Sequence, residues 1–550
     1  MNGRWLYFKT QYPLVKRLLA DTKRGKDIQQ KVLLDKISRS IESDFGRRHG
    51  FSRIRSAADF RRSVPITDFE YFRPYVQRVQ EGQTTALFGP QTKLLMFALT
   101  SGTTEKPKHI PVTDHFVRDY KRGWKLWGLQ THANHMDLLT KNYLHLASDW
   151  QQHTTPSGIW CGNISGLAAE TRPAIVRRPF VVPPETAKMK DWVNRQYAVL
   201  RMSMLSDRIG MIITANPLTL VKMAELADQQ KEMLIRDIHD GTVTFPLETQ
   251  DSYHPKLKRK LLKADKRRSR ELERLAQHRG NLLPADFWPN LSVVAVWMGG
   301  PLGAFLPEVR RLYGNTALRD HGLSASEGRM TLPMQDEANA GLLDFTSNYF
   351  EFIPTQVYGD ADAETLEAHE LQAGEQYYIL LTNSAGMFRY NIQDVVECVG
   401  FEGQVPLLKF LHKGAHCTNV AGEKLTEYQV AAAVHNSFVS LRRHVETVML
   451  VPEMGNPPRY VLLMEQHSCE IGSSLAQTVD SNLAQLNCEY EDRLKTGRLN
   501  PIRIQTVPSG TWDNYRERRI ASKGGSQEQY KHAFLGQSYD FYEELIQSNK

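Results

Sequence analysis

The chain has 550 residues, more than one compact core of ordinary size holds, so we expect two or more domains. Hydrophobic residues make up 41% of the sequence, and no apolar run approaches the roughly 18 residues of a membrane helix. Lysine and arginine outnumber aspartate and glutamate by 69 to 61, a formal net charge of +8. The N-terminus also lacks the apolar core of a signal peptide, so the sequence argues against a membrane protein and favours a cytoplasmic one.

The first 75 residues have helical patterning, with an amphipathic stretch from Ile28 to Ile41. Near the end of this segment, Pro65 and Pro74 bracket a short helix that Thr67 or Asp68 could cap. We therefore expect a helical segment before the first strand.

A loop rich in small hydroxyl residues follows a buried strand expected at Leu94–Leu99. Residues 100–111 read TSGTTEKPKHIP. Gly102 allows close approach of the backbone, hydroxyl and N–H groups donate to oxygens, and a lysine neutralises charge, which suits a polyphosphate. No Walker A pattern is present. An ordinary Ser/Thr-rich turn is the alternative, and the loop alone does not decide between the two.

The next segment, Thr113 to Leu129, has helical spacing with an aromatic stripe on one side. The stripe consists of Phe116, Tyr120, Trp124 and Trp127. Such a stripe is more typical of a core than of a substrate pocket, although behind a phosphate loop it could serve as both. We interpret the scattered histidines as unrelated core or surface residues, because no pair has i, i+4 spacing beside a carboxylate. They are His132, His135, His145 and His153.

Five cysteines are widely spaced and none forms a C-x-x-C pair. They are Cys161, Cys398, Cys417, Cys469 and Cys488. This odd number argues against a disulfide framework or a cysteine-based zinc site and fits a reducing cytosol.

Apolar runs alternate with turns and helical segments from residue 140 to 312, which predicts an α/β domain. The runs are Tyr143–Leu146, Ile175–Val182, Ile209–Thr214 and Leu291–Trp297. Asn216 and Pro217 mark the start of a helix that we expect to continue to Leu234, and another helix is expected at Ala304–Leu312.

Much of the positive excess lies between Lys256 and Arg274. Such a run could bind nucleic acid or an acidic membrane. Leucines interleave it, and Glu271 and Glu273 begin to balance it. A solvated helix face is therefore the preferred interpretation, and we expect no nucleic-acid and no membrane partner.

Two later stretches contain acidic residues that suit a nucleotide site. Residues 318–330, LRDHGLSASEGRM, surround Glu327 with glycines and serines, and one carboxylate near a phosphate loop could hold Mg²⁺. Residues 346–354 and 377–401 are expected to be consecutive strands, with Arg389 and Asp394 around a turn. Asp394 could accept hydrogen bonds from a ribose diol, whereas an Arg389–Asp394 ion pair is the structural alternative.

The pattern changes near residue 410 to mixed α+β. Helices are expected at 426–438 and 474–486, and strands at 445–451, 460–464 and 502–507. We therefore predict a large N-terminal α/β domain, residues 1–411, and a smaller C-terminal α+β domain, residues 412–550. In the tail, Gly524 and Gly525 predict a flexible loop that carries Lys531.

Five motifs in this order resemble the auxin-responsive Gretchen-Hagen-type acyl acid–amido synthetases, a branch of the adenylate-forming superfamily that includes firefly luciferase and acyl-CoA ligases. The resemblance covers about residues 40–535. The motifs are TSGTT…K-x-I-P at 100–111, SASEG at 324–328, YFEFIP at 349–354, TNSAGMFRYNIQDVV at 382–396 and SKGGSQEQYK at 522–531. Each motif alone is weak, and five in register are a strong signal.

The resemblance implies an ATP-dependent ligase that adenylates a small carboxylic acid, releases pyrophosphate, and transfers the acyl group to an amino acid or amine with release of AMP. It implies ATP and Mg²⁺ as cofactors. It also assigns residues that wrap the ATP phosphates: Thr100, Ser101, Gly102, Thr103, Thr104 and Lys108.

By the same resemblance, Ser324, Ala325 and Ser326 lie along the adenine, Glu327 binds magnesium and Asp394 binds the ribose. The catalytic set is Arg389, Lys424 and Lys531. These cations suit the chemistry, because a carboxylate that attacks the α-phosphate meets strong negative charge. The C-terminal domain is expected to swing about a hinge near His412–Ala415, with Gly414 as its pivot.

Several positions depart from the family pattern. Glu105 and Gln393 stand where glycines are usual, Leu323 replaces an aromatic that stacks on adenine, and His412-Lys413 stands where arginine is common. These departures leave weakened or altered ATP handling open as an alternative, and they do not refute ATP use.

Three alternatives to the amido synthetase therefore stay open: an acyl-CoA ligase of the same superfamily, a catalytically degenerate nucleotide-binding scaffold, and a basic nucleic-acid binder. We expect the acyl pocket around Trp124, Trp127 and Met298–Leu302. The acid, the amine and the oligomeric state are left open.

Overall fold

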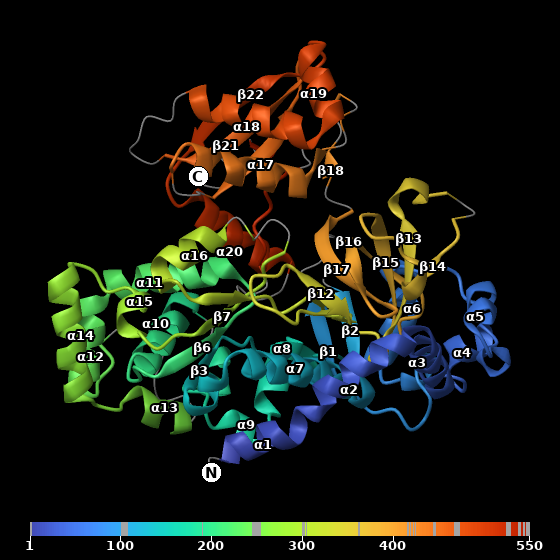
Figure 1. Ribbon diagram of the computed structural model, residues 1–550, viewed down its shortest axis with the longest axis horizontal. Coiled ribbons are helices and arrows are strands. Elements are labelled where there is room, and N and C mark those ends of the chain that lie inside the picture. Colours follow the sequence, from blue (N-terminus) through green and yellow to red (C-terminus); the bar gives the residue numbers. More distant parts are fainter. Residues whose placement is uncertain are drawn as a thin grey trace.

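The computed structural model describes residues 3–100, 108–189, 191–244, 255–299, 303, 305–360, 363–414, 417, 418, 420, 421, 423, 425–443, 447–466, 473–523, 530–536, 541, 542 and 545. Within them, helices cover and separate several β-sheets (Figure 1). Among these residues no helix combines the length and the apolar composition needed to cross a membrane.

The N-terminal segment is helical, as predicted. Its helices are α1 (Gly3–Gln11), α2 (Pro13–Asp21), α3 (Gly25–Arg39), α4 (Asp44–Arg48), α5 (Ala57–Ser63) and α6 (Phe69–Gln80). Asp68 caps α6 by accepting a hydrogen bond from Tyr71 N. Pro74 was expected to end this helix and instead lies inside it, because buried apolar residues on both sides of it hold the helix against the core.

A four-stranded sheet, in the order β2-β1-β5-β4, contains the strands that flank the hydroxyl-rich loop. Its strands are β1 (Leu94–Thr100), β2 (Lys108–Thr113), β4 (His153–Thr154) and β5 (Trp160–Gly162). β1 and β2 pair antiparallel, with Thr100 opposite Lys108, so the segment 101–107 joins their ends. Helix α7 (Asp114–Asn134) follows directly, and Thr113 caps it.

A parallel sheet forms the α/β part of the chain, as predicted. Its order is β3-β6-β7-β8, and its strands are β3 (Asn142–His145), β6 (Ile209–Ile213), β7 (Val293–Ala295) and β8 (Ala317–Arg319). The helices between them are α8 (Ile164–Glu170), α9 (Ala174–Arg177), α10 (Trp192–Ser203), α11 (Pro217–Gln229), α12 (Lys231–Asp240), α13 (Pro255–Leu261), α14 (Lys266–Arg279), α15 (Pro284–Phe287) and α16 (Leu306–Tyr313). All four strands end at the same edge, where ligands bind in open α/β sheets.

Two expectations for this region were wrong in detail. The apolar run Ile175–Val182 begins inside the short helix α9 and does not form a strand of the sheet. Arg177 and Arg178 interrupt its apolar pattern, and only Phe180 forms an isolated bridge, to Tyr143. The helix expected to run from Pro217 to Leu234 divides into α11 and α12 near Gln230.

The basic segment forms the helices α13 and α14, and its leucines are buried. Arg268 is also buried and pairs with Glu271 at 2.8 Å. The apolar side of both helices therefore faces the core, as expected for helices with one solvated face.

A seven-stranded antiparallel sheet has the order β11-β12-β17-β16-β15-β13-β14. Its strands are β11 (Thr331–Leu332), β12 (Ala340–Leu343), β13 (Tyr349–Pro354), β14 (Leu366–Glu367), β15 (Gln376–Thr382), β16 (Tyr390–Glu402) and β17 (Val405–Lys413). The short hairpin β9 (Ser324–Ala325) and β10 (Gly328–Arg329) precedes it.

A bulge interrupts β16. Tyr378 pairs with Val395, and two residues further along β15 Leu380 pairs with Asn391, so β16 contains extra residues between these pairs. Gln393 lies in this bulge and has a left-handed backbone, with φ of 62°. The position therefore has the conformation that the family's usual glycine adopts without strain.

The C-terminal part has its own three-stranded sheet, which lies at the top of Figure 1. Its strands are β20 (Val448–Glu453), β21 (Arg459–Glu465) and β22 (Asn500–Val507). The other elements here are β18 (Cys417–Thr418), β19 (Leu425–Thr426), α17 (Glu427–Ser440), α18 (Ser473–Leu486), α19 (Cys488–Lys495) and α20 (Thr511–Lys523). The expected boundary between residues 411 and 412 falls inside β17, and the division into two domains stays a prediction.

We predict that Gln393→Gly raises the free energy of unfolding by about 0.5–1 kcal/mol, because removing the side chain relieves a left-handed strain of roughly 1–2 kcal/mol and adds backbone entropy to the unfolded chain. Chemical denaturation measures the change. The matched control is Gln376→Gly at the exposed start of β15, which should destabilise the fold. Equal destabilisation by both substitutions would contradict the strain.

Candidate active site

Six polar side chains from distant parts of the sequence lie together near the C-terminal segment 530–536. We call them the charged cluster: Lys108, Glu327, Tyr390, Asp394, Lys413 and Lys531. Lys108 Nζ lies 3.5 Å from the Tyr390 hydroxyl, which lies 3.4 Å from Glu327 Oε1. Lys413 Nζ lies 3.4 Å from Asp394 Oδ1. The cluster therefore brings cations, acids and a phenol together.

Local structure explains how these residues reach the same place. Lys108 begins β2, and Lys413 ends β17 directly opposite Asp394 in the neighbouring strand. Glu327 lies in the turn of the hairpin β9–β10, and its carbonyl oxygen accepts a hydrogen bond from Asn383 Nδ2 at 2.6 Å. Ser326 Oγ donates to Leu99 O at 3.1 Å, which ties this turn to the end of β1.

The acids of the charged cluster are deeply placed, since Glu327 and Asp394 each expose 5% of their surface. Burial lowers the pKa of Lys108, and Glu327 partly opposes this shift. The pKa of Lys413 is raised, mainly by Asp394. Burial raises the pKa of Tyr390, so its hydroxyl keeps its proton and can donate to Glu327.

Lys531 enters the charged cluster from the far end of the sequence. Its Nζ lies 3.5 Å from the centroid of the Trp297 ring, just beyond β7. Two contacts hold its segment against the carboxyl edge of the parallel sheet: Asn216 Nδ2 donates to Tyr530 O at 2.7 Å, and the rings of Phe305 and Phe534 lie 6.2 Å apart.

The environment of Lys531 makes its amine unusually acidic. Its pKa is lowered to about 8, mainly because the surrounding protein desolvates the amine; Lys413 adds to this shift, while Asp394, Glu427 and Glu327 oppose it. The side chain nevertheless remains accessible to solvent. The amine is therefore a cation near neutral pH that lies in a recess and can still reach a ligand.

The side chain of Arg389 is not part of the charged cluster. Its Nε donates to Glu351 Oε2 at 3.0 Å, and its other nitrogens donate to Thr365 Oγ1 and to the carbonyls of Arg61 and Val64. The alternative of an Arg389–Asp394 ion pair is wrong, since Asp394 pairs with Lys413. These contacts favour a structural role for Arg389, and its catalytic role stays a prediction.

Of the other residues predicted for the site, the structure describes some, and the rest lie outside the described residues. Ser324 and Ala325 form β9, with Ser324 exposed, and Leu323 is buried in the core at 6% exposure. Thr100 ends β1 opposite Lys108. Other named positions lie outside the described residues: Ser101, Gly102, Thr103, Thr104, Glu105, Ala415 and Lys424.

Sequence reasoning did not assign Tyr390, Lys413 or Trp297 to the site. Lys413 was noted only as a replacement for arginine, and the register between β16 and β17 that pairs it with Asp394 is not visible in the sequence. Tyr390 follows Arg389 directly, so strand alternation, which turns neighbouring side chains to opposite faces, could have distinguished the two.

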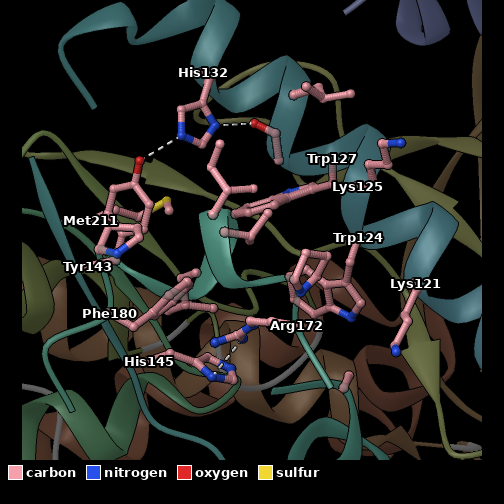
Figure 2. A pocket seen from close by; sticks show the side chains of 18 of the residues that line it. Lys121, Trp124, Lys125, Trp127, His132, Tyr143, His145, Arg172, Phe180 and Met211 are labelled. Carbon is pink, nitrogen blue, oxygen red and sulfur yellow. Dashed lines mark hydrogen bonds between the residues drawn. The ribbon is translucent and has the colours of Figure 1, made fainter. Parts of the chain in front are cut away.

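A cavity of about 360 Å³ lies beside α7, β3 and β6 (Figure 2). Trp124 and Trp127 line it, as expected for the acyl pocket, whereas the described part of Met298–Leu302 does not. The aromatic stripe of α7 thus serves both the core and the cavity. The guanidinium of Arg329, two residues after Glu327, lies 4.5 Å from the Trp124 ring. Trp124 therefore separates the cavity from the hairpin that carries Glu327.

The cavity is aromatic and cationic. Arg4, Lys121, Lys125 and Arg172 line it, and none of the described lining residues is aspartate or glutamate. Arg172 donates to His145 Nδ1 at 2.9 Å and lies 4.1 Å from the Phe180 ring. Burial lowers its pKa to about 10, so the guanidinium is charged at neutral pH. Such a lining favours an aromatic anion.

The histidines of the cavity are neutral at physiological pH. Burial lowers the pKa of His132 to about 4, and its ring nitrogens contact Gly128 O and the Tyr143 hydroxyl. Burial also lowers the pKa of His145. These histidines therefore orient neighbouring groups and add no charge to the cavity.

Three family models match most of the chain. The GH3 family N-terminal domain matches residues 14–318, the GH3 family central domain residues 341–413, and the GH3 family C-terminal domain residues 428–540. The jasmonoyl–L-amino acid synthetase GH3.5 of Oryza sativa subsp. japonica is 24% identical, over 93% of this chain and 92% of its own. The indole-3-acetic acid-amido synthetase GH3.3 of Arabidopsis thaliana is 21% identical, over 94% and 90%.

Solved structures show the same fold. The GH3.15 acyl acid amido synthetase matches with a TM-score of 0.84 at 18% identity, over 98% of this chain and 96% of that one. A 2-hydroxyisobutyryl-CoA ligase in the postadenylation state matches with a TM-score of 0.54 at 13% identity, over 95% and 91%. The adenylate-forming fold predicted from the sequence, with its large N-terminal and smaller C-terminal parts, is confirmed.

We predict that Lys531 reacts with an amine-acylating reagent at pH 8 faster than the exposed Lys495, because its pKa lies near 8. Mass spectrometry of labelled peptides across a pH series measures both rates. Lys413→Met should raise the apparent pKa of Lys531, and Asp394→Asn should lower it, since these neighbours act with opposite signs. A rate for Lys531 that rises only near pH 10 would contradict the assignment.

Proposed function

Because this chain belongs to the GH3 family, we propose that it is an ATP-dependent acyl acid–amido synthetase. It adenylates a carboxylic acid with release of pyrophosphate and then transfers the acyl group to an amino acid or another amine with release of AMP. The observation that carries the proposal is the charged cluster, which Lys531 completes from the C-terminal segment.

The adenylation step determines which charged groups the site needs. A carboxylate oxygen forms a bond to the α-phosphorus of ATP while the bond from that phosphorus to the pyrophosphate oxygen breaks. The carboxylate and the phosphates are both negatively charged, so fixed cations are needed at the phosphates. Lys108 begins the strand that follows the segment 101–107, and Lys531 lies near Asp394, Lys413 and Glu327 in the charged cluster. Both are placed to offset that charge.

Asp394 and Lys413 act as a pair in this proposal. Asp394 accepts hydrogen bonds from the ribose, and Lys413, whose Nζ lies 3.4 Å from Asp394 Oδ1, helps to position the carboxylate. The bulge at Gln393 turns the Asp394 side chain out of the regular strand pattern. Strain at Gln393 is therefore part of how the ribose site is built.

The residues present fit one magnesium ion. Glu327 offers a buried carboxylate beside Lys108 and Tyr390, and Mg²⁺ in nucleotide sites commonly uses one or two carboxylates together with phosphate oxygens. When bound, the ion neutralises phosphate charge. The Tyr390 hydroxyl orients the carboxylate of Glu327 for this role.

The cavity beside α7 supports an aromatic carboxylic acid as the acyl substrate. Its walls supply Trp124, Trp127, Tyr143 and Phe180, and its cations raise the local concentration of an organic anion. Arg172 lies against the Phe180 ring (Figure 2), and Arg4 lies against the Tyr143 ring.

The proposal keeps two further expectations. The C-terminal part moves between the two steps about the hinge predicted near His412–Ala415, whose pivot Gly414 donates its N–H to Gln393 O at 2.7 Å. A Cβ atom at Gly414 would lie 2.5 Å from the Tyr378 ring, so only glycine fits this contact.

The protein acts in the cytoplasm, which free thiols at Cys161, Cys398 and Cys488 support.

ATP–pyrophosphate exchange with a panel of aromatic acids tests the adenylation step. We expect Lys531→Ala and Asp394→Ala each to lower the exchange rate by about 100-fold, since each removes a charge-stabilising or positioning group. Lys495→Ala, at an exposed lysine that pairs with Glu491, is the control and should leave the rate unchanged. Wild-type rates in both site variants would refute the site.

Arg172→Gln should raise the KM for the acid by about tenfold with little change in kcat, because the cation attracts the acid and does not touch the reacting phosphate. Steady-state exchange at varied acid concentration separates the two constants. Arg177→Gln, on the exposed side of α9, provides a control of the same charge change. A loss of kcat with an unchanged KM would contradict this role.

A further inference from the structure

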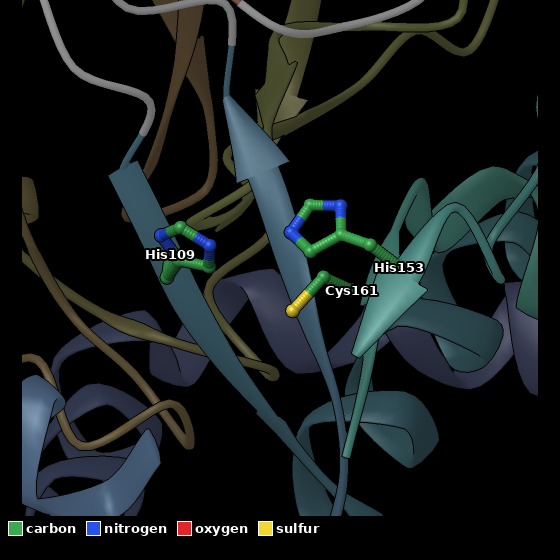
Figure 3. Close-up of side chains that lie close together, drawn as sticks. All are labelled: His109, His153 and Cys161. Carbon is green, nitrogen blue, oxygen red and sulfur yellow. The ribbon is translucent and has the colours of Figure 1, made fainter. Parts of the chain in front are cut away.

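Three potential metal ligands lie close together on the four-stranded sheet (Figure 3). His109, His153 and Cys161 each offer a ligand atom, and these atoms all lie within 4.8 Å of one another. They come from three strands of one sheet, β2, β4 and β5. The sequence gives no sign of this grouping, because the three residues have none of the short spacings typical of zinc motifs.

Strand register places the three side chains on one face. His153 pairs with Cys161, Cys161 pairs with Phe97, and His109 lies two residues from Pro111, the other partner of Phe97. Paired residues share a face, as do residues two apart in a strand. Backbone pairing thus places all three residues on the same face of the sheet.

We propose that His109, His153 and Cys161 bind a Zn²⁺ ion, with a fourth position open to solvent. Two imidazoles and a thiolate are the ligand types that zinc prefers, at about 2.0–2.1 Å from nitrogen and about 2.3 Å from sulfur. His153 is exposed and gives the ion access, whereas Cys161 is fully buried. The inference stands independently of the proposed ligase activity.

Zinc binding must displace the proton of the Cys161 thiol. Burial raises the pKa of this thiol to about 11, so it is protonated at neutral pH without metal. Binding therefore releases a proton to solvent and forms the sulfur–metal bond, and zinc affinity should increase with pH.

The site lies on the face of β2 opposite the charged cluster. Lys108 and His109 are neighbours in the strand, so their side chains point to opposite faces. A bound ion would link β2 to β4 and β5 across β1. Zinc would thus brace the strand that carries Lys108 without occupying the place of a ligand at the charged cluster.

Titration of the full-length, tag-free protein with Zn²⁺ against a chromophoric chelator tests the proposal. We expect one tight site per chain, weakened more than about 100-fold in Cys161→Ser and His153→Ala, since losing a ligand exceeds the roughly 10–100-fold cost of losing an outer-shell partner. Cys488→Ser and His278→Ala, both at exposed positions, should bind as the wild type does. Unchanged affinity in Cys161→Ser, or an equal loss in the controls, would overturn the site.

Two further measurements keep the test independent of folding. Substitution by Co²⁺ should give a thiolate-to-metal charge-transfer band that Cys161→Ser lacks and the buried-cysteine control Cys398→Ser retains. Hydrogen exchange in the peptide 108–113 should slow when zinc is added to the wild type. A cobalt spectrum without sulfur character would overturn the ligand set, and unchanged exchange would overturn the bracing role.

Discussion

The contact between Lys531 and Trp297 is the interaction on which the site depends. Buried charges are costly unless opposite charges or polar groups surround them. Lys413 lies near both Lys108 and Lys531, and Asp394 and Glu327 offset part of their charge. The site therefore gains its third cation, and with it an excess of positive charge over these two acids, only when the C-terminal segment lies against the parallel sheet, as the Asn216–Tyr530 hydrogen bond holds it.

This dependence links the architecture to the proposed chemistry. Three sheets deliver parts of one site: the hairpin β1–β2 brings Lys108, the seven-stranded sheet brings Asp394 and Lys413, and the parallel sheet brings Trp297. The aromatic cavity lies beside them, separated by Trp124. A nucleotide at the charged cluster and an acid in the cavity would thus approach each other across the hairpin that carries Glu327.

The sequence predicted the fold well where local chemistry decides it. Asp68, Thr113 and Asn216 begin helices through side-chain caps, and the motif order identified the family. Tertiary packing overrode local signals at Pro74. In the site, Lys108, Glu327, Asp394 and Lys531 lie together, whereas Arg389 binds Glu351. Tyr390, Lys413 and the His109–His153–Cys161 group were not predicted because strand register, which is set by long-range pairing, brings them to their partners.

The most direct test of the account measures AMP formation by purified protein with ATP, magnesium and an aromatic acid, with either an amino acid or coenzyme A as the second substrate. The account predicts that AMP accumulates only when both the acid and an amino acid or related amine are present, with an amide as the product. AMP formation that depends on coenzyme A would instead identify an acyl-CoA ligase. A protein that does not bind ATP would contradict the account at its first step.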